Sequence, residues 1–470
     1  MKKARLLFFL LIGNLFYLGT SFAQKKSNVL ELEFVMKTFF DTHQVFFPVR
    51  STVTFSKKKD GYYIDLLNEK FKVYKSEKYY DLATKTFHKI SVFKYKENPT
   101  DSDLSFIRDG QKVIYNTSEK IKEYKERSTL FKDAAFYPYF GYAGYYNDII
   151  KLFAGEEKLL PNDLYCLCKS YSTKLGSKLT KNAQYGLEVE EFENPDSNFL
   201  TPKELIEYQA LFGIEKKCYQ KLKTQYPAFI TNRGDAKEKY GHIIMQSFVQ
   251  LIIRSEDTIA NQLLEDSLYS KEILSKARKT LNSCSKNSIL LTRTEIDTYP
   301  LYYLQAAENL RTDITLINTA FIVRPNYFSF IYKGPFESTP IQSTIPLQVV
   351  NKTTVFYNRN SGTPNLNISA ADFLSDLEND SLYLNSNSDT NHFEARGNKI
   401  VFNPKDTLSA QVDTYPNVVL PTFFFIDLVC IIDILSNNDR DVLVSSQFPK
   451  EYFDKFSAVV EKENYYKIIR

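Results

Sequence analysis

The stretch from residue 288 to residue 318 constrains the fold more than any other part of the sequence. It reads SILLTRTEIDTYPLYYLQAAENLRTDITLIN, in which two apolar runs, SILLT and DITLIN, flank a segment with a helical pattern. Both runs are continuous rather than alternating, as in strands that helices cover on both faces. A strand, a helix and a strand in this order predict a right-handed crossover between parallel strands. We therefore expect an α/β unit with a parallel βαβ core.

Polar side chains gather where these predicted strands end. Ligands of parallel α/β sheets bind outside the carboxyl ends of the strands. The N-terminus of the intervening helix also offers free N–H groups to an anion or to sugar hydroxyls. The candidate ligand-binding residues are those that follow the first strand, begin the helix or end the second strand: Glu295, Asp297, Thr298, Tyr299 and Asn318.

The same residues have a structural interpretation. Asp297 or Thr298 would be an ordinary N-cap for a helix that carries Pro300 in its first turn. Arg311 and Asp313 would then form an ion pair at the following turn. In the alternative, chemical interpretation, Glu295 and Asp297 act as a general acid and a general base. The pattern favours the structural role over ligand binding, and ligand binding over catalysis.

The first residues indicate export. MKKARLLFFLLIGNLFYLGTSFAQ has a basic start, an apolar stretch and a small-residue exit, which is the pattern of a secretory signal peptide cleaved after Ala23. We therefore expect a periplasmic or secreted protein. Lys2, Lys3 and Arg5 supply three of the net charges in a chain of +4, so the mature chain is near +1. A nearly neutral chain lacks the electrostatic footprint of a nucleic-acid-binding protein.

No later segment predicts a membrane span after signal cleavage. The stretch VVLPTFFFIDLVCIIDIL comes closest, but Pro421, Asp427 and Asp433 interrupt it. Charged residues are costly in lipid, so the stretch is interpreted as buried core.

The mature chain is expected to contain three regions of different pattern. Residues 28–125 predict a β-rich domain, residues 128–283 a helical region, and residues 284–470 the α/β unit. A polar, turn-rich excursion at about 335–400 interrupts the last region and is interpreted as a surface or flexible loop. The predicted fold class is therefore mixed α and β, with a signal peptide at residues 1–23.

The β-rich region is predicted as an antiparallel meander. Residues 61–93, GYYIDLLNEKFKVYKSEKYYDLATKTFHKISVF, contain four short runs rich in aromatic and branched residues. Turn-prone residues such as LNE or SEK separate these runs, and the many lysines would lie on a solvated face.

Three segments of the helical region have helical patterns, and two of them begin with a start signal. GYYNDIIKLFAGE has helical spacing, PNDLYCLCKSYSTKL starts with a proline, and TPKELIEYQALFGIEKKCYQKLKTQYPAF starts with Thr201 and has Glu204 three residues later. The end of the last segment, YQKLKTQYPAF, is similar to the close of a tetratricopeptide-type hairpin. A helical bundle and a degenerate tetratricopeptide-like array both fit, because no 34-residue period is established.

The catalytic and metal-binding equipment of the sequence is sparse. No nucleophile elbow, phosphate-binding glycine loop, paired-histidine zinc motif or calcium loop occurs. The five cysteines, Cys166, Cys168, Cys218, Cys284 and Cys430, show no disulfide or metal-ligand spacing and are interpreted as small buried groups. We predict no catalytic residues, no metal and no cofactor, and the interpretation leans away from an enzyme.

The stretch EIDTYPLYYLQAAENLRTDITLIN resembles a bacterial family of large multi-spanning membrane proteins. Those proteins are similar to protein O-mannosyltransferases in their membrane half and carry a soluble C-terminal half that reads close to G-D-N-D-T-Y-P-L-W-Y-L-Q-E-x-E-G-x-R-x-D-V-x-x-x-N. The resemblance covers residues of about 240–450 and is strongest at 288–318. The matching residues are Asp297, Thr298, Tyr299, Pro300, Leu301, Tyr303, Leu304, Gln305, Glu308, Arg311, Asp313 and Asn318.

A second match and two departures qualify the resemblance. IDILSNNDRDVLVSS is similar to a later family motif at Asp433, Ile434, Asn437 and Arg440. The Gly-Asp-Asn of the family is replaced by residues 294–296, Thr-Glu-Ile, and the membrane half is missing. The resemblance implies shared architecture and a periplasmic setting, without the transferase activity expected of the membrane half.

Two functions follow as expectations. The first is a non-enzymatic interaction or accessory module of the cell envelope, with an envelope protein as its partner. The alternative is a carbohydrate-binding or carbohydrate-active protein, with a glycan at the strand ends near Glu295 and Asp297.

Overall fold

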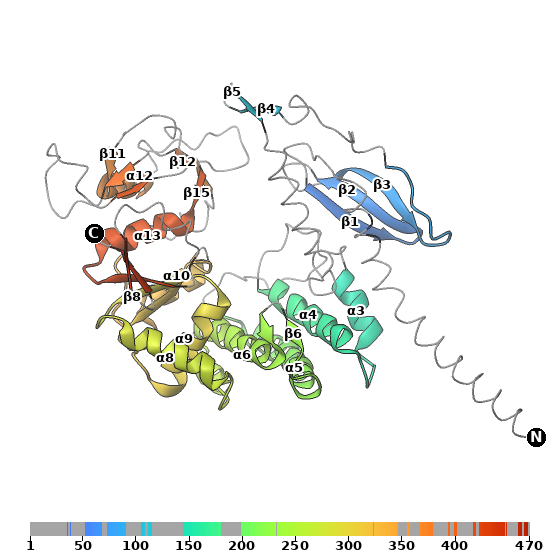
Figure 1. The fold of residues 1–470 in the computed structure, drawn as a ribbon, viewed down its shortest axis with the longest axis horizontal. Coiled ribbons are helices and arrows are strands. Elements are labelled where there is room, and N and C mark those ends of the chain that lie inside the picture. Colours follow the sequence, from blue (N-terminus) through green and yellow to red (C-terminus); the bar gives the residue numbers. More distant parts are fainter. Residues whose placement is uncertain are drawn as a thin grey trace, which may run out of the picture. The chain divides into compact units, whose positions relative to one another are not determined.

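The computed structural model (Figure 1) divides the chain into two compact units. The first unit comprises Met1–Pro195 and Tyr208–Leu222, and the second comprises Asp196–Glu207 and Lys223–Arg470. The structure describes residues 35, 38, 52–67, 73–90, 105–108, 111–114, 144–179, 199–231, 233–322, 324–345, 355–357, 367–378, 393–394, 399–401, 417–419, 423–446, 448, 459–462 and 465–468. The predicted signal peptide at residues 1–23 lies outside the described residues.

The first unit contains an antiparallel sheet of three strands, β1 (Thr52–Lys58), β2 (Gly61–Leu67) and β3 (Val73–Asp81). This confirms β-rich structure in the N-terminal region. The predicted turn at SEK is wrong, because Ser76, Glu77 and Lys78 lie inside β3 and pair with β2. Cross-strand pairing overrides the local turn preference there. A separate hairpin consists of β4 (Ser105–Arg108) and β5 (Gln111–Ile114).

Three helices of the middle region confirm its helical pattern: α3 (Tyr145–Phe153), α4 (Pro161–Lys178) and α5 (Pro202–Gln225). The start of α5 is the predicted one. The Thr201 backbone N–H donates to Oε2 of Glu204 over 2.8 Å, and the Glu204 N–H donates to Oγ1 of Thr201 over 3.3 Å. This reciprocal pair is a capping box. Whether the helices form a tetratricopeptide-like array stays a prediction.

The second unit begins with a short hairpin and a group of helices. The hairpin pairs β6 (Ile230–Thr231) with β7 (Gly234–Asp235), and α6 (Ala236–Ile252), α7 (Asp257–Asn261) and α8 (Lys271–Ser283) follow. Side chains fix both long helices at their starts, since Asp235 accepts from the Glu238 N–H and Ser270 accepts from the Ile273 N–H. Helix α6 is buried along most of its length.

A five-stranded sheet forms the centre of the second unit, in the order β17–β18–β16–β8–β9. The strands are β8 (Ile289–Thr292), β9 (Thr315–Asn318), β16 (Val442–Ser445), β17 (Val459–Glu461) and β18 (Tyr465–Ile468). β8 runs parallel to both β9 and β16, and β18 is antiparallel to β16. The predicted parallel βαβ core is therefore confirmed, with α9 (Glu295–Glu308) as the crossover helix.

Helices cover both faces of this sheet. In Figure 1, α13 (Ile426–Asn437) lies on one side of the strands, and α8 and α9 lie on the other. β8, β9 and β16 are accordingly buried at every residue. The helix that follows β8, α9, and the helix that precedes β16, α13, therefore lie on opposite faces of the sheet. A topological switch point therefore lies between β8 and β16.

The polar excursion at about 335–400 includes regular structure among its described residues. Helix α12 (Ala370–Glu378) buries Phe373 and Leu374. Further along, Phe423–Phe425 form a strand that leads directly into α13. The remaining elements are α10 (Pro325–Tyr332), η4 (Pro335–Glu337), β10 (Val355–Tyr357), β11 (Asn367–Ser369), β12 (Phe393–Glu394), β13 (Lys399–Val401), β14 (Asn417–Val419) and β15 (Phe423–Phe425).

Two small sheets organise these strands, in the orders β12–β10–β15 and β11–β13–β14. Residues 379–392 of the polar excursion lie outside the described part of the chain. Among the helices that are described, none combines the length and the apolar character needed to cross a membrane.

Candidate functional site

The carboxyl ends of β8 and β9 are the place where the sequence predicts a ligand site. Helix α9 starts directly after β8, with Thr294 as its N-cap and Asp297 at the third helical position. The prediction that Asp297 or Thr298 is the N-cap is therefore wrong, and Pro300 lies inside the helix rather than in its first turn. The capping box of Thr294 and Asp297 starts the helix earlier than the proline signal indicates.

Asp297 is a buried acceptor for its own helix. Its Oδ1 accepts from the Thr294 N–H over 2.7 Å and from the Thr294 hydroxyl over 2.8 Å, and its Oδ2 accepts from the Arg293 N–H over 3.2 Å. Asp297 is only 6% exposed. Burial raises the pKa of the Asp297 carboxyl, while the hydrogen bonds from Thr294 and Arg293 act in the opposite direction. The carboxyl is thus committed to capping.

Thr298 and Asn318 join the ends of the two strands. Oγ1 of Thr298 lies 2.8 Å from Oγ1 of Thr292 and 2.6 Å from the carbonyl oxygen of Thr294, and it accepts from Nδ2 of Asn318 over 2.9 Å. Oδ1 of Asn318 accepts from the Ala320 N–H over 2.9 Å. Both residues are almost fully buried. We call Thr292, Thr294, Asp297, Thr298 and Asn318 the carboxyl-edge cluster.

Tyr299 is part of the hydrophobic core. It is 1% exposed, and its ring lies 6.0 Å from the His242 ring and 6.5 Å from the Phe321 ring, measured between centroids. The structure therefore brings Asp297, Thr298 and Asn318 together, and it places Tyr299 in the packing between α9 and α6.

Glu295 differs from the other four predicted residues because its side chain keeps 25% of its exposure. Its Oε2 lies 3.8 Å from Nε of Arg233, whose side chain is 37% exposed. This ion pair joins the β6–β7 hairpin to the start of α9. Of the five candidates, Glu295 is the one that a ligand at the strand ends can reach.

The switch point between β8 and β16 contains residues that the sequence analysis missed. Arg293, directly after β8, donates from Nη1 to Oδ2 of Asp427 over 2.9 Å. Its guanidinium carbon also lies 5.9 Å from the centre of the Phe448 ring, just after β16. The Arg293 side chain is 31% exposed, whereas that of Asp427 is 7% exposed. Their meeting depends on the pairing of β8 with β16, and no local sequence signal reports that pairing.

The arrangement can bind polar groups at the switch point. Arg293, Arg233 and Glu295 supply partly exposed donors and acceptors at the strand ends. Within the residues that the structure describes, no three His, Cys, Asp or Glu side chains gather closely enough to hold a metal ion.

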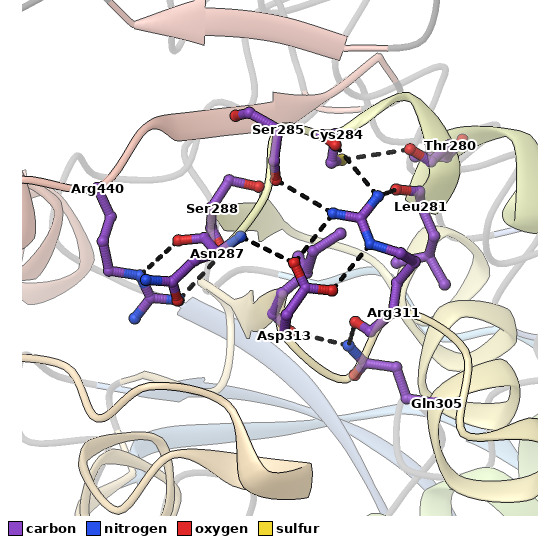
Figure 2. Close-up of polar contacts among 11 residues, drawn as sticks. Thr280, Leu281, Cys284, Ser285, Asn287, Ser288, Gln305, Arg311, Asp313 and Arg440 are labelled. Atoms are coloured by element: carbon purple, nitrogen blue, oxygen red, sulfur yellow. Dashed lines mark hydrogen bonds and ion pairs between the residues drawn. The ribbon is translucent and has the colours of Figure 1, made fainter.

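A second polar cluster lies at the opposite, amino ends of the strands (Figure 2). Arg311 forms a bidentate ion pair with Asp313, in which Nε donates to Oδ1 over 2.8 Å and Nη2 donates to Oδ2 over 3.0 Å. This confirms the predicted pairing. The same guanidinium donates to the carbonyl oxygens of Leu281 in the last turn of α8 and of Cys284 and Ser285 just after it. We call Asn287, Arg311, Asp313 and Arg440 the amino-edge cluster.

Asp313 and Gln305 extend the cluster to the turns on each side. Oδ2 of Asp313 accepts from the Asn287 N–H over 2.8 Å, just before β8. The hydrogen bond from Arg311 lowers the pKa of Asp313 to about 2. Gln305 donates from Nε2 to the carbonyl oxygens of Arg311 and Ile314, which fixes the turn between α9 and β9.

Arg440 joins three strands at this edge. It donates to the carbonyl oxygens of Asn287 over 2.8 Å and of Thr339 over 2.7 Å, and to Oγ1 of Thr315 over 2.5 Å. Burial lowers the pKa of Arg440 to about 10. Arg440 precedes β16, so these hydrogen bonds connect β16 with β8 and β9. This is a structural reason for the arginine that matches the family motif.

Asp433 holds the segment that follows η4 against α13. Its Oδ1 accepts from the Thr344 N–H over 3.0 Å, from the Thr344 hydroxyl over 2.9 Å and from Nδ2 of Asn437 over 2.7 Å. Asp433 is fully buried. Burial raises its pKa above the ordinary value, against the effect of these hydrogen bonds.

We expect Asp433→Asn to change the pH dependence of stability. The raised pKa means that the folded chain holds this proton above pH 3.8, the value at which an ordinary aspartate ionises. The free energy of unfolding of the wild type therefore falls as pH rises from about 4 through the raised pKa. Asparagine cannot ionise, so the variant lacks this part of the fall.

Urea unfolding between pH 4 and pH 7 measures this effect. The stability of Asp433→Asn relative to the wild type should increase with pH across that interval. Asp439→Asn, at an exposed position nearby, is the control for removing a carboxylate. Parallel curves for the wild type and Asp433→Asn would contradict the assignment.

Comparison with known proteins supports a family relation for part of the second unit. Residues 273–420 match the family model TMEM260-associated domain 2. TMEM260 is a membrane-protein family, which fits the resemblance of this region to a part of a membrane protein outside its membrane half. The matched TMEM260-associated domain 2 region runs from α8 to β14 and includes the carboxyl-edge cluster. No curated protein and no solved structure matches the chain significantly.

The residues shared with the resembling membrane proteins fall mainly on scaffold positions of this region. Asp297, Thr298 and Asn318 belong to the carboxyl-edge cluster, and Arg311 and Asp313 belong to the amino-edge cluster. Tyr299, Leu301, Tyr303 and Leu304 are buried in the core. The shared motif thus specifies how β8, α9 and β9 are joined.

Proposed function

We propose that this chain is an exported accessory module of the cell envelope, which acts by binding a partner protein rather than by catalysis. The signal-peptide pattern of residues 1–23 supports export. The TMEM260-associated domain 2 match supports a role linked to membrane proteins. We also propose that this region is related to the soluble part of membrane proteins that resemble protein O-mannosyltransferases.

The burial of Asp297, Thr298 and Asn318 at the carboxyl edge of the sheet carries the proposal. In parallel α/β enzymes, the reacting groups lie at this edge and face the substrate. Here Asp297, Thr298 and Asn318 are buried and bonded to the protein itself. A buried cap is a stabilising device, so these side chains support scaffolding better than chemistry.

The exposed groups around this edge suit a protein partner. Ile230 is 71% exposed on the β6–β7 hairpin, and Ile296 is 36% exposed at the start of α9. The ion pair of Arg233 and Glu295 ties these two segments together. Apolar side chains beside partly exposed charges are the usual composition of an interface with a polar rim.

Cross-linking in intact cells, followed by purification of the chain from envelope extracts, tests the proposal. We expect a specific envelope protein to be captured by the wild type and lost with Ile230→Ser. The control is Val460→Ser, which removes another exposed apolar side chain, 41% exposed on β17. Recovery of this chain alone, with no cross-linked partner, would count decisively against the proposal.

Carbohydrate binding is the second candidate, and the accessible side chains at the switch point favour it. Glu295 and Arg293 can accept from and donate to sugar hydroxyls, and both stand at the carboxyl edge of the sheet. If they hold a glycan, removal of one charged hydrogen bond should weaken its binding roughly 10-fold to 100-fold. A glycan array probed with Glu295→Gln and Arg293→Ala measures this effect.

The matched control for that array is Glu308→Gln, at the other end of α9. Glu308 pairs with Arg278 over 2.7 Å at an exposed position, so its substitution removes a similar carboxylate away from the strand ends. Equal glycan binding by the wild type, Glu295→Gln and Arg293→Ala would eliminate the carbohydrate role.

A further inference from the structure

Two cysteines from different helices meet in the interior of the first unit. Cys168 on α4 is 0% exposed and Cys218 on α5 is 8% exposed. Their Sγ atoms lie 2.7 Å apart. A disulfide bond places its sulfur atoms about 2.05 Å apart, so a movement of less than about 1 Å brings this pair within bonding distance.

We propose that Cys168 and Cys218 form a disulfide bond in the mature protein and thereby join α4 to α5. The inference rests on the export part of the proposed function, because disulfides form and persist in oxidising compartments. It assigns a covalent link to two cysteines whose sequence spacing suggests only small buried side chains.

Contacts on both sides of the cysteines hold the two helices in register. Tyr165 and Tyr219 pack edge to face, with 6.4 Å between ring centroids. One turn further along α4, the Ser172 hydroxyl donates to Glu215 and lies 3.2 Å from the Tyr219 hydroxyl. Because these contacts already align α4 with α5, the disulfide requires a small side-chain adjustment instead of a shift of the backbone.

The oxidation proceeds by thiol–disulfide exchange with an external disulfide, such as that of a thiol oxidoreductase or oxidised glutathione. The thiolate of one cysteine attacks that disulfide, forms a mixed disulfide and releases one thiol of the oxidant. The second cysteine, as a thiolate, attacks the mixed disulfide and releases the other thiol. The cysteine pair loses two electrons and two protons, and the oxidant disulfide becomes two thiols.

The timing of this exchange follows from burial. Burial raises the pKa of the Cys168 thiol well above its ordinary value, so the folded protein supplies little thiolate. The exchange therefore takes place while the helices are still assembling. Once formed, the bond is shielded from reductants until the unit opens.

Refolding of the purified chain in a buffer of oxidised and reduced glutathione tests the bond itself. After refolding, free thiols are alkylated under denaturing conditions and the chain is digested for mass spectrometry. Of the five cysteines, we expect Cys168 and Cys218 in one linked peptide and the other three alkylated. Alkylation of all five, or linkage of a different pair, would overturn the proposal.

Variants and thermal unfolding supply an independent measurement. Cys218→Ala should abolish the linked peptide, whereas the control Cys284→Ala should retain it. The two cysteines are 50 positions apart in the sequence, and reduction should lower the melting temperature of the wild type by roughly 5–15 °C. A wild type that is reduced in denaturant, refolded with reductant and still melts at the same temperature as the oxidised protein would contradict a structural disulfide.

The redox state inside the cell separates this inference from export. If the chain is exported, thiols trapped with acid in intact cells should show the linked peptide. A linked peptide after refolding together with fully reduced cysteines in the cell would reject export and keep the pairing. Absence of the linked peptide after refolding would reject the pairing whatever the compartment.

Discussion

Arg311→Ala is expected to lower the free energy of unfolding of the second unit by about 3 kcal/mol. The substitution removes both hydrogen bonds to Asp313 and leaves the carbonyl oxygens at the end of α8 without their guanidinium donor. It also leaves Asp313 as an uncompensated charge. Chemical denaturation followed by circular dichroism measures the loss.

Arg278→Ala is the matched control for this substitution. Arg278 pairs with Glu308 over 2.7 Å, but both side chains are more exposed than those of Arg311 and Asp313. Exposed ion pairs contribute less than about 1 kcal/mol. If the two variants lose the same stability, the carbonyl contacts of Arg311 have no special importance.

The pH dependence of this pair has a defined sign. The folded-state pKa of Asp313 is lowered to about 2, below the ordinary value of 3.8. The pair therefore contributes stability that is fully present above pH 4 and is lost as pH falls toward 2. Arg311→Ala should show a weaker acid-dependent loss than the wild type over that interval.

Asp297→Ala is expected to destabilise the second unit by about 2–3 kcal/mol. It removes the buried acceptor for the N–H groups of Arg293 and Thr294 and for the Thr294 hydroxyl. The start of α9 then loses its capping box while it remains enclosed by protein. Hydrogen exchange should show faster opening of the first turn of α9, and denaturation should show the global loss.

Glu295→Ala, two residues earlier, separates capping from ligand binding. It pairs with Arg233 over 3.8 Å at a partly exposed position, so a loss of less than about 1 kcal/mol is expected. A large loss of stability in Glu295→Ala, with little in Asp297→Ala, would reverse the roles that the structure gives to the two acids.

The sequence predicts the βαβ core well because its signals are local. Two continuous apolar runs, a helical segment between them and the capping residues are all contained within residues 288–318. The structure confirms parallel strands with α9 as the crossover. The same locality explains the confirmed pairing of Arg311 with Asp313, which are two residues apart.

The misplaced helix start shows a competition between two local signals. Pro300 favours a start just before it, whereas Thr294 and Asp297 favour a start at Glu295. The reciprocal hydrogen bonds of the capping box prevail, and the proline is accommodated within the helix. The SEK prediction failed for another reason, because pairing with β2 extends β3 through residues with turn preference.

The residues at the switch point could not be predicted because their contacts are distant in sequence. Arg293 meets Asp427 and Phe448 only after β16 has taken its place beside β8. Residues 442–445 form β16, but no local sequence signal states which strand it pairs with. The sequence therefore predicts β8 and β9 at the candidate site but not β16, which is the other neighbour of β8.

The pairing of β8 with a strand near the C-terminus also limits when the central sheet can form during synthesis. Ile289 of β8 is paired with Val442 of β16, 153 residues later in the chain. At a synthesis rate of about 5–20 residues per second, one edge of β8 waits roughly 8–30 s for its partner. A nascent chain in this interval presents an apolar, unpaired strand, and a chaperone that shields it until the C-terminal strands emerge would protect the product from aggregation.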